Sequence, residues 1–277
     1  MKRAKRWLAI SLLLSGCASP PHRQTAINGI HLETIGRGEP LLFLHGGFLD
    51  SRIWEPQEGA LGQHFSLILF DRLGAGESQA LTRPYSPVES IKELLDAQGI
   101  DRVTLVGQSM GARIAIEFAL EHPERVKALI LASPGLNGFT FSKEHDRRLS
   151  LLFKEKTAEK MLERWLADPY MSPAMHNPEI TKRVRDISAH NIKRHFENDS
   201  FPLLWPKTTA ASRLSKVRAR TLILVGTKDV PEILSIAELL KSKIPHAKKI
   251  SIEGSGHLIN MERPEVFNRL VIAFLKS

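Results

Sequence analysis

A serine at position 109 is flanked by glycines in the sequence Gly107-Gln108-Ser109-Met110-Gly111. An apolar run over 102–106 precedes this pentapeptide and a helical pattern over 112–121 follows it, so it fills a strand-to-helix turn. The two glycines remove Cβ atoms that would collide where a strand and a helix close on each other. Such a tight turn pushes the serine hydroxyl toward a base and toward oxyanion donors, which is what a serine needs to act as a nucleophile. Because small residues recur at any tight turn of this kind, the rest of the catalytic site must be found elsewhere in the chain.

An aspartate and a histidine follow this serine, each just past a later apolar run. Asp229 comes after a buried strand predicted at 220–225, and His257 comes after a short strand predicted at 249–252. The 28 residues from Asp229 to His257 suffice for the helix predicted at 232–243 and one strand, which bring the chain back to the same edge of a parallel sheet. Catalytic groups of open α/β sheets collect at that edge. The order serine, acid, histidine therefore indicates a Ser-His-Asp triad.

Glycines also follow the apolar strand predicted at 40–44, in His45-Gly46-Gly47-Phe48. Without a side chain in the way, a backbone N–H group can approach a developing oxyanion. We therefore expect the amides of Gly47 and Met110 to form an oxyanion hole. Phe48 and Met110 are the residues that we expect to contact the substrate.

These residues resemble the α/β-hydrolase family. The likeness runs from about residue 27 to residue 274 and includes the Asn28-Gly29 hairpin tip and the tail Gly-His-Leu-Ile-Asn-Met-Glu-Arg-Pro at 256–264. The resemblance implies an α/β fold with a mostly parallel, eight-stranded sheet flanked by helices, and a helical cap inserted after the sixth strand. It also implies that nucleophile, orienting acid and base are Ser109, Asp229 and His257.

Other candidate residues have structural interpretations. Some relatives carry the acid after the strand that precedes the cap, but no Asp or Glu lies between Ser133 and Ser142, which leaves Asp229 by elimination. We expect Asp71 to hold its own loop through side-chain to backbone hydrogen bonds. We expect His45 to pack beneath the oxyanion loop, with a role as a second base as the alternative.

Nothing in the sequence indicates a cofactor or a nucleic-acid partner. The histidines are scattered, and neither H-E-x-x-H nor C-x-x-C occurs, so a metal site has little support. Gly74-Ala75-Gly76 is too short to match a dinucleotide-binding fingerprint. No nucleic-acid recognition motif is present.

The N-terminus has the plan of a signal peptide. Its basic residues lie within 2–6, an apolar stretch of eight residues covers 7–14, and Leu14-Ser-Gly-Cys17 ends with the only cysteine in the chain. Eight residues are too few for a bilayer, which needs about 20. The last four residues resemble a bacterial lipobox. This resemblance implies a signal peptide at 1–16, lipid on Cys17, and a tether at 17–24 that holds the protein to a membrane of the cell envelope. Since Ala18 rather than Asp follows the cysteine, we expect the periplasmic face of the outer membrane in a host that has one.

A helical insertion interrupts the strand rhythm between residues 133 and 220. Candidate helices at 143–156, 157–167 and 179–196 are separated by prolines. We place the cap at 137–216 and the core at 25–136 and 217–277. Residues 137–220 contain 17 Lys and Arg against 10 Asp and Glu. These charges could draw anionic substrates or an acidic membrane surface, but their interleaving with glutamates favours solvated helix faces.

The sequence thus predicts a serine hydrolase, and within that class a carboxylic-ester hydrolase that acts on small ester or acyl substrates. A serine nucleophile argues against the dehalogenase and epoxide-hydrolase branches, which use aspartate. A carbon–carbon bond hydrolase stays open, because caps of this size and a Ser-Met pair occur in that branch, and so does an aminopeptidase of the same fold. A non-catalytic ligand receptor that retains the triad is the alternative from another class.

Overall fold

The computed structural model describes residues 22–198 and 201–277. The predicted signal peptide and the lipidation site Cys17 lie outside these residues. The strands are β1 (His22–Ile27), β2 (Ile30–Gly36), β3 (Pro40–Leu44), β4 (Ser66–Phe70), β5 (Val103–Gln108), β6 (Val126–Ala132), β7 (Arg220–Gly226) and β8 (Lys248–Ile252). The α-helices are α1 (Glu55–Leu61), α2 (Pro87–Ala97), α3 (Met110–Glu121), α4 (Lys143–Phe153), α5 (Ala158–Leu166), α6 (Pro178–Glu197), α7 (Pro231–Lys243), α8 (Ile259–Glu262) and α9 (Pro264–Lys276). Short 3₁₀ helices are η1 (Ser51–Trp54), η2 (Pro123–Arg125), η3 (Ala174–His176), η4 (Ala210–Ser212) and η5 (Leu214–Lys216).

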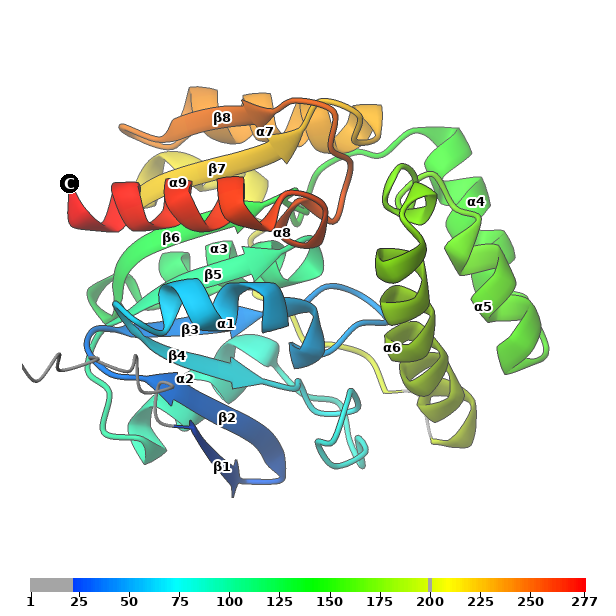
Figure 1. Cartoon of the computed structure of the whole chain (residues 1–277), viewed down its shortest axis with the longest axis horizontal. Helices are drawn as coiled ribbons and strands as arrows, with labels where there is room; N and C mark the ends of the chain where they lie inside the picture. Colours follow the sequence, from blue (N-terminus) through cyan, green and yellow to red (C-terminus); the bar gives the residue numbers. More distant parts are fainter. Residues whose placement is uncertain (1–21, 199–200) are drawn as a thin grey trace, which may run out of the picture.

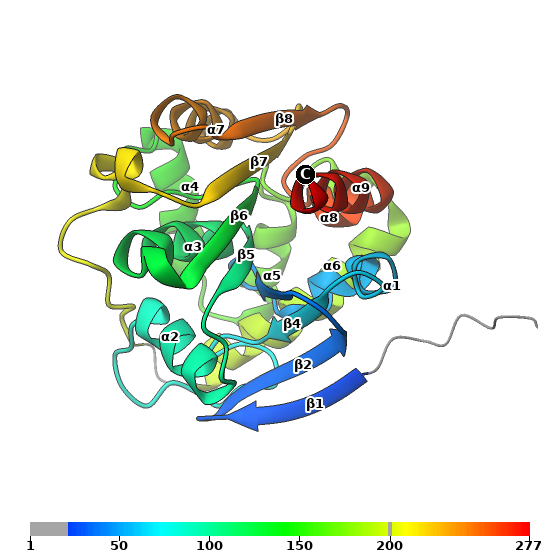
Figure 2. The same ribbon diagram turned by 90° about the vertical axis from the view of Figure 1, so that its left-hand side faces the viewer.

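One eight-stranded sheet carries the fold, in the order β1-β2-β4-β3-β5-β6-β7-β8 (Figure 1). Strand β2 is antiparallel to β1 and β4, and every other neighbouring pair is parallel. Helices α1, α8 and α9 cover one face, while α2, α3 and α7 cover the other (Figures 1 and 2). Covered on both faces, the central strands carry continuous buried apolar runs, as in Leu222-Ile223-Leu224-Val225 of β7. The predicted α/β fold with a mostly parallel, eight-stranded sheet is confirmed.

The sheet begins earlier than the sequence indicated. Asn28 and Gly29 form the two-residue tip between β1 and β2, both with positive φ, as a tight hairpin requires. From this tip the pairing extends from Ile27 opposite Ile30 back to His22 opposite Ile35. Residues 22–24, which we assigned to the tether, therefore belong to β1, because antiparallel pairing gives their backbone groups partners in β2.

The insertion between β6 and β7 contains helices α4, α5 and α6. They lie beyond the carboxyl ends of the parallel strands (Figure 1). Each begins where a polar side chain accepts a hydrogen bond from the first turn, in the order Ser142, Thr157 and Asn177. The proline-punctuated segments thus fold as separate helices over the edge of the sheet where catalytic groups collect.

Helix α6 fastens this cap to the core. The Asn191 side chain donates to Asp50 Oδ2 at 2.7 Å and accepts from the Gly76 N–H at 2.9 Å. Buried Glu117 of α3 joins the two segments that connect the cap to the core, which we call the root of the cap. Its carboxylate accepts hydrogen bonds from Asn137 on the segment that enters the cap, and from the Ala210 N–H and Arg213 on the segment that leaves it. Within residues 22–198 and 201–277, no helix has the length and apolarity to cross a membrane.

Candidate active site

Ser109 occupies the turn between β5 and α3 with an unusual backbone. Its φ is 53° and its ψ is −114°, a conformation that L-residues rarely adopt. The flanking glycines permit the turn, because a Cβ on Gly111 would lie 2.0 Å from the Leu44 carbonyl oxygen and one on Gly107 would lie 2.5 Å from the Ala112 nitrogen. The strained backbone conformation therefore falls on Ser109, whose hydroxyl lies at the carboxyl end of β5.

The three predicted triad residues meet. His257 Nε2 lies 2.9 Å from Ser109 Oγ, and His257 Nδ1 lies 3.0 and 3.1 Å from the two carboxylate oxygens of Asp229. Asp229 Oδ1 also accepts the N–H of Val230 at 2.8 Å, which fixes the carboxylate. Histidine and aspartate are both buried, with 3% and 6% of their surfaces exposed. This order of contacts suits proton transfer from the serine to an imidazole that the aspartate orients.

A second carboxylate holds the backbone of the histidine loop. Glu262 accepts the Gly256 N–H at 2.9 Å through Oε2 and the Leu258 N–H at 3.0 Å through Oε1, so it spans His257 on both sides. Burial raises the pKa of Glu262, and the two amide hydrogen bonds oppose that shift. Gln108 makes a third hydrogen bond to this loop, since its Nε2 donates to the His257 carbonyl oxygen at 3.1 Å.

An aromatic side chain of the cap, Tyr170, packs against the ring of His257. The Tyr170 ring centroid lies 4.6 Å from that of His257, and both rings are buried. Burial raises the pKa of Tyr170, and the nearby charge of Asp229 adds to the shift, so the phenol stays neutral. Tyr170 therefore shields one side of the imidazole from water.

The amides predicted to form the oxyanion hole belong to two residues that line one cavity. Met110 is the first residue of α3, where a backbone N–H has no acceptor within the helix. Gly47 follows β3 and precedes Phe48, whose φ is 52°. Among the described residues, neither the Gly47 amide nor the Met110 amide donates a hydrogen bond. Both N–H groups are therefore free for a substrate oxygen.

His45 packs beneath this loop, as we expected. Its ring is fully buried, with Nδ1 2.9 Å from the Gly46 carbonyl oxygen, while Nε2 accepts the Arg72 N–H at 3.1 Å. Burial, with a contribution from the charge of Arg72, lowers the pKa of His45 from 6.5 to about 3. The ring is therefore neutral with its proton on Nδ1, and its only lone pair is already used, which excludes the alternative of a second base.

Asp71 holds its own loop, which confirms the second structural interpretation. Its Oδ1 accepts the Ser51 N–H and its Oδ2 accepts the Glu77 N–H, each at 2.8 Å. Burial raises the pKa of Asp71, and these amide hydrogen bonds oppose that shift. Both oxygens are occupied by backbone groups, so Asp71 has no part in the triad.

A cavity of about 420 Å³ opens beside the nucleophile, between the core loops and α6. Gly47 and both predicted substrate contacts, Phe48 and Met110, line it. Its size is within the range of small-molecule sites, about 300–1,000 Å³. Much of the remaining wall is apolar and includes Leu49, Leu81, Phe153, Phe201 and Leu203. The sequence could not identify the cap residues among these.

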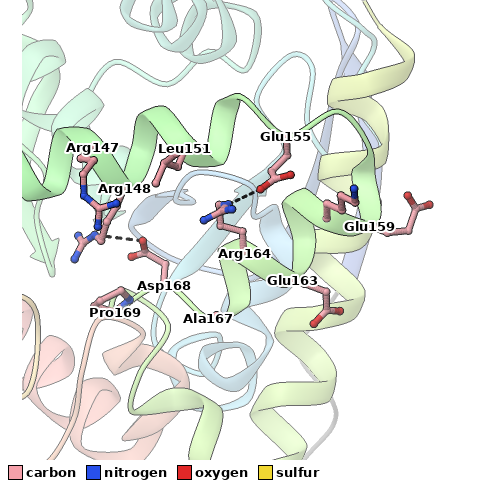
Figure 3. Close-up of a pocket in the computed structure, with 11 residues that line it drawn as sticks. Arg147, Arg148, Leu151, Glu155, Glu159, Glu163, Arg164, Ala167, Asp168 and Pro169 are labelled. Atoms are coloured by element: carbon pink, nitrogen blue, oxygen red, sulfur yellow. Dashed lines mark hydrogen bonds and ion pairs between the residues drawn. The ribbon is translucent and has the colours of Figure 1, made fainter.

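A larger hollow of about 700 Å³ lies on the cap, between α4 and α5 (Figure 3). No triad or oxyanion residue lines it, and its walls are charged. Two ion pairs lie within this wall, Arg164 with Glu155 at 2.6 Å and Arg148 with Asp168 at 3.5 Å. The smaller cavity, which adjoins Ser109, is therefore the candidate substrate site.

Sequence reasoning assigned no role to Glu262, Gln108 or Tyr170. For Glu262 a weak signal existed, because an acid five residues after the histidine lies one short helix away from it. Gln108 and Tyr170 carried none, since a buried glutamine before the serine and an aromatic residue in the cap read equally well as packing.

Comparison with known proteins agrees with the observed fold. Residues 39–264 match the family described as alpha/beta hydrolase fold. A 2-hydroxy-6-oxo-6-phenylhexa-2,4-dienoate hydrolase from Burkholderia cepacia is 31% identical over 269 residues, which cover 90% of this chain and 91% of that protein.

Solved structures are similar as well. An esterase from Exiguobacterium antarcticum superposes with a TM-score of 0.73 at 25% identity, covering 90% of this chain and 96% of the other. A carboxylesterase from Bacillus subtilis superposes with a TM-score of 0.75 at 20% identity, over 94% and 92% of the two chains, and at that identity the likeness concerns the fold alone.

Proposed function

Because the chain belongs to the alpha/beta hydrolase fold family, we propose that it is a serine hydrolase that cleaves carboxylic esters through an acyl-enzyme. The observation that carries this proposal is the unbroken chain of contacts from Ser109 Oγ through His257 to Asp229, at 2.9 and 3.0 Å. A receptor for ligands would need the cavity but not this alignment.

The reaction follows from the positions of the atoms. Ser109 Oγ attacks the ester carbonyl while His257 Nε2 takes its proton and passes it to the leaving alcohol. Asp229 holds the imidazole and stabilises the imidazolium that forms. The free amides of Gly47 and Met110 stabilise the oxyanion of the tetrahedral intermediate. Water then attacks the acyl-enzyme by the same route, with His257 as the base.

The test is covalent labelling followed by turnover. The protein should react with a fluorophosphonate probe and hydrolyse p-nitrophenyl esters, and Ser109→Ala should abolish both. The stability of that variant should stay within about 1 kcal/mol of wild type, because the change removes only a hydroxyl group and leaves the strained backbone of the turn as it is. If the variant keeps more than a few per cent of turnover, the covalent serine mechanism is wrong.

Carbon–carbon bond hydrolysis is the second candidate. The relative from Burkholderia cepacia is named for such a substrate, whereas the esterase from Exiguobacterium antarcticum supports the first candidate. Assaying 2-hydroxy-6-oxo-6-phenylhexa-2,4-dienoate beside p-nitrophenyl esters of rising chain length separates the two. A kcat/KM for the dienoate well above that of every ester would favour the second candidate.

We also propose that the enzyme is anchored to the cell envelope by lipid on Cys17. The support is the sequence alone: a basic segment, eight apolar residues and Leu14-Ser-Gly-Cys17. Cys17→Ser should abolish acyl labelling and partition into detergent, while turnover of soluble esters persists. Mass spectrometry of the native N-terminus decides the matter, and an unmodified peptide cut elsewhere would contradict the proposal.

A further inference from the structure

Three residues that line the active-site cavity carry a buried polar atom without a hydrogen-bond partner. The atoms are Nε of Arg72, the hydroxyl of Tyr85 and Nε of Arg194. Buried polar groups in folded proteins are almost always paired, so each exception needs an explanation. All three atoms are hydrogen-bond donors, so three residues of the cavity wall each keep a donor that no described residue satisfies.

The charged side chains of the cavity wall also favour an acceptor, because they are positive. Arg72 and Arg194 line it, whereas no Asp or Glu does among the described residues. Each guanidinium donates one hydrogen bond to a backbone carbonyl, Arg72 to Gly46 at 3.1 Å and Arg194 to Ser78. Neither forms an ion pair with any residue that the structure describes.

Other arginines of the cap are paired. Arg164 lies 2.6 Å from Glu155 (Figure 3), and Arg185 lies 2.6 Å from Glu163. Asp71 precedes Arg72 in the sequence, but its two carboxylate oxygens accept the N–H groups of Ser51 and Glu77. Asp50 is bonded to Arg52 and Asn191. Arg72 and Arg194 thus keep positive charges that the described protein does not neutralise.

We propose that this part of the cavity binds a carboxylate, and that the substrate is an ester whose far end carries one, such as a half-ester of a dicarboxylic acid. The inference rests on the proposed ester hydrolysis. Guanidinium groups form the strongest hydrogen bonds to carboxylates, and the Tyr85 hydroxyl would add a third donor. The apolar wall of Phe153, Phe201 and Leu203 would contact the carbon chain between the carboxylate and the ester.

Core and cap would then hold the substrate together. Arg72 lies in the loop after β4 and Arg194 on α6, so one carboxylate would lie between elements 122 residues apart in sequence. Because the oxyanion donors Gly47 and Met110 line the same cavity, the length of the carbon chain would determine which ester carbonyl reaches Ser109.

The experiment compares matched esters. 4-Nitrophenyl half-esters of glutaric, adipic, pimelic and suberic acid are assayed beside the methyl ester of each, with the spontaneous rates subtracted. The wild type should prefer the free carboxylate in at least one pair, with kcat/KM about ten- to hundredfold higher, as a charge-assisted hydrogen bond provides. A kcat/KM ratio of one or less in every pair would overturn the proposal.

Variants identify the groups responsible. Arg72→Met and Arg194→Met should each lower the ratio by about tenfold or more. Lys193→Met is the matched control, because Lys193 is the exposed neighbour of Arg194 on α6, pairs with Glu197 and does not line the cavity. The control should keep the wild-type ratio. If both arginine variants keep it, or if the lysine variant loses it equally, specific recognition by the two arginines is wrong.

A binding measurement separates this inference from the proposed function and does not depend on the folding of the arginine variants. Ser109→Ala is titrated calorimetrically with monomethyl adipate and dimethyl adipate, and with the mono- and dimethyl esters of the other three acids. At least one monoester should bind about tenfold more tightly than its diester. Such binding without turnover of any ester by the wild type would contradict ester hydrolysis and support carboxylate recognition. Turnover of neutral esters without preferential binding of any monoester would support ester hydrolysis and contradict carboxylate recognition.

Discussion

The catalytic centre and the cap are held in different ways. Ser109, Asp229 and His257 follow β5, β7 and β8, and each is fixed by backbone geometry or by hydrogen bonds from its own loop. The cap depends on a few side chains that reach across to the core, chiefly Asn191 and Glu117. The chemistry therefore belongs to the core, while the cap closes the cavity and contributes Tyr170 to the histidine.

This difference separates two kinds of defect. Changes in the catalytic loops should lower the rate of the chemical step in a folded protein. Changes at the contacts of the cap should lower stability or alter selectivity while the serine stays reactive.

Removing the charge of Asp229 should have the largest effect on rate. Asp229→Asn should slow acylation by roughly 10⁴, because the imidazole then loses its orienting acceptor and favours the wrong tautomer. Asp71→Asn is the control, since the Asp71 carboxylate bonds to the backbone N–H groups of Ser51 in η1 and Glu77 in its own loop, and the change should mainly affect stability. Rapid-mixing kinetics with a p-nitrophenyl ester checks both. The assignment is wrong if the Asp71 variant is inactive but folded and the Asp229 variant is active.

Stability should depend on pH through His45. Its pKa in the folded protein is about 3, below its ordinary 6.5, so unfolding takes up a proton between these values. The stabilisation is complete above about pH 6.5 and is lost as pH falls toward 3. Between pH 7 and pH 5 the loss should be about 2 kcal/mol.

His45→Gln provides the comparison, because it has no titrating ring. Denaturant unfolding of both proteins at pH 7, 6 and 5 measures the slope. The variant should be less stable at pH 7 and lose less stability on acidification. Equal slopes in the two proteins would contradict the buried, neutral histidine.

Weakening the root of the cap should cost stability but leave the nucleophile intact. Glu117→Gln keeps an acceptor for Asn137 and the Ala210 N–H but removes the charge that faces Arg213, so we expect a loss of about 2 kcal/mol. Glu121→Gln, on the same helix and paired with the same arginine but more exposed, should lose less than about 0.5 kcal/mol. Fluorophosphonate labelling should stay within about twofold of wild type in both. Equal losses of stability, or failed labelling of a folded Glu117 variant, would argue against the division.

The smallest effect should come from the carboxylate that spans the histidine. In Glu262→Gln one of the two backbone N–H groups faces an amide NH₂, which shifts His257, and we expect kcat to fall about tenfold with KM unchanged. Glu265→Gln, on the exposed surface of α9, is the control and should change neither constant. A Glu262 variant with lower thermal stability but wild-type kcat would show that the residue only supports the fold.

Much of the sheet could be predicted from the sequence for a plain physical reason. Parallel strands covered on both faces read as continuous apolar runs, so β3 was predicted at its observed bounds and β7 to within one residue. The Asn28-Gly29 tip and the glycines around Ser109 mark turns that few other residues permit. Since the strand ends of a parallel sheet lie at one edge, the meeting of Ser109, Asp229 and His257 could be inferred from their order alone.

Tertiary structure alone decided the features that depend on contacts between distant loops. Glu262 spans His257 because a one-turn helix folds back on the histidine loop, and nothing in its local pattern specifies that direction. Arg72 and Arg194 line one cavity only because α6 lies over the loop after β4. Periodicity and turn chemistry report which face of an element is buried. They carry no information on which side chains of two separate elements will share a cavity, because packing across the interface determines that.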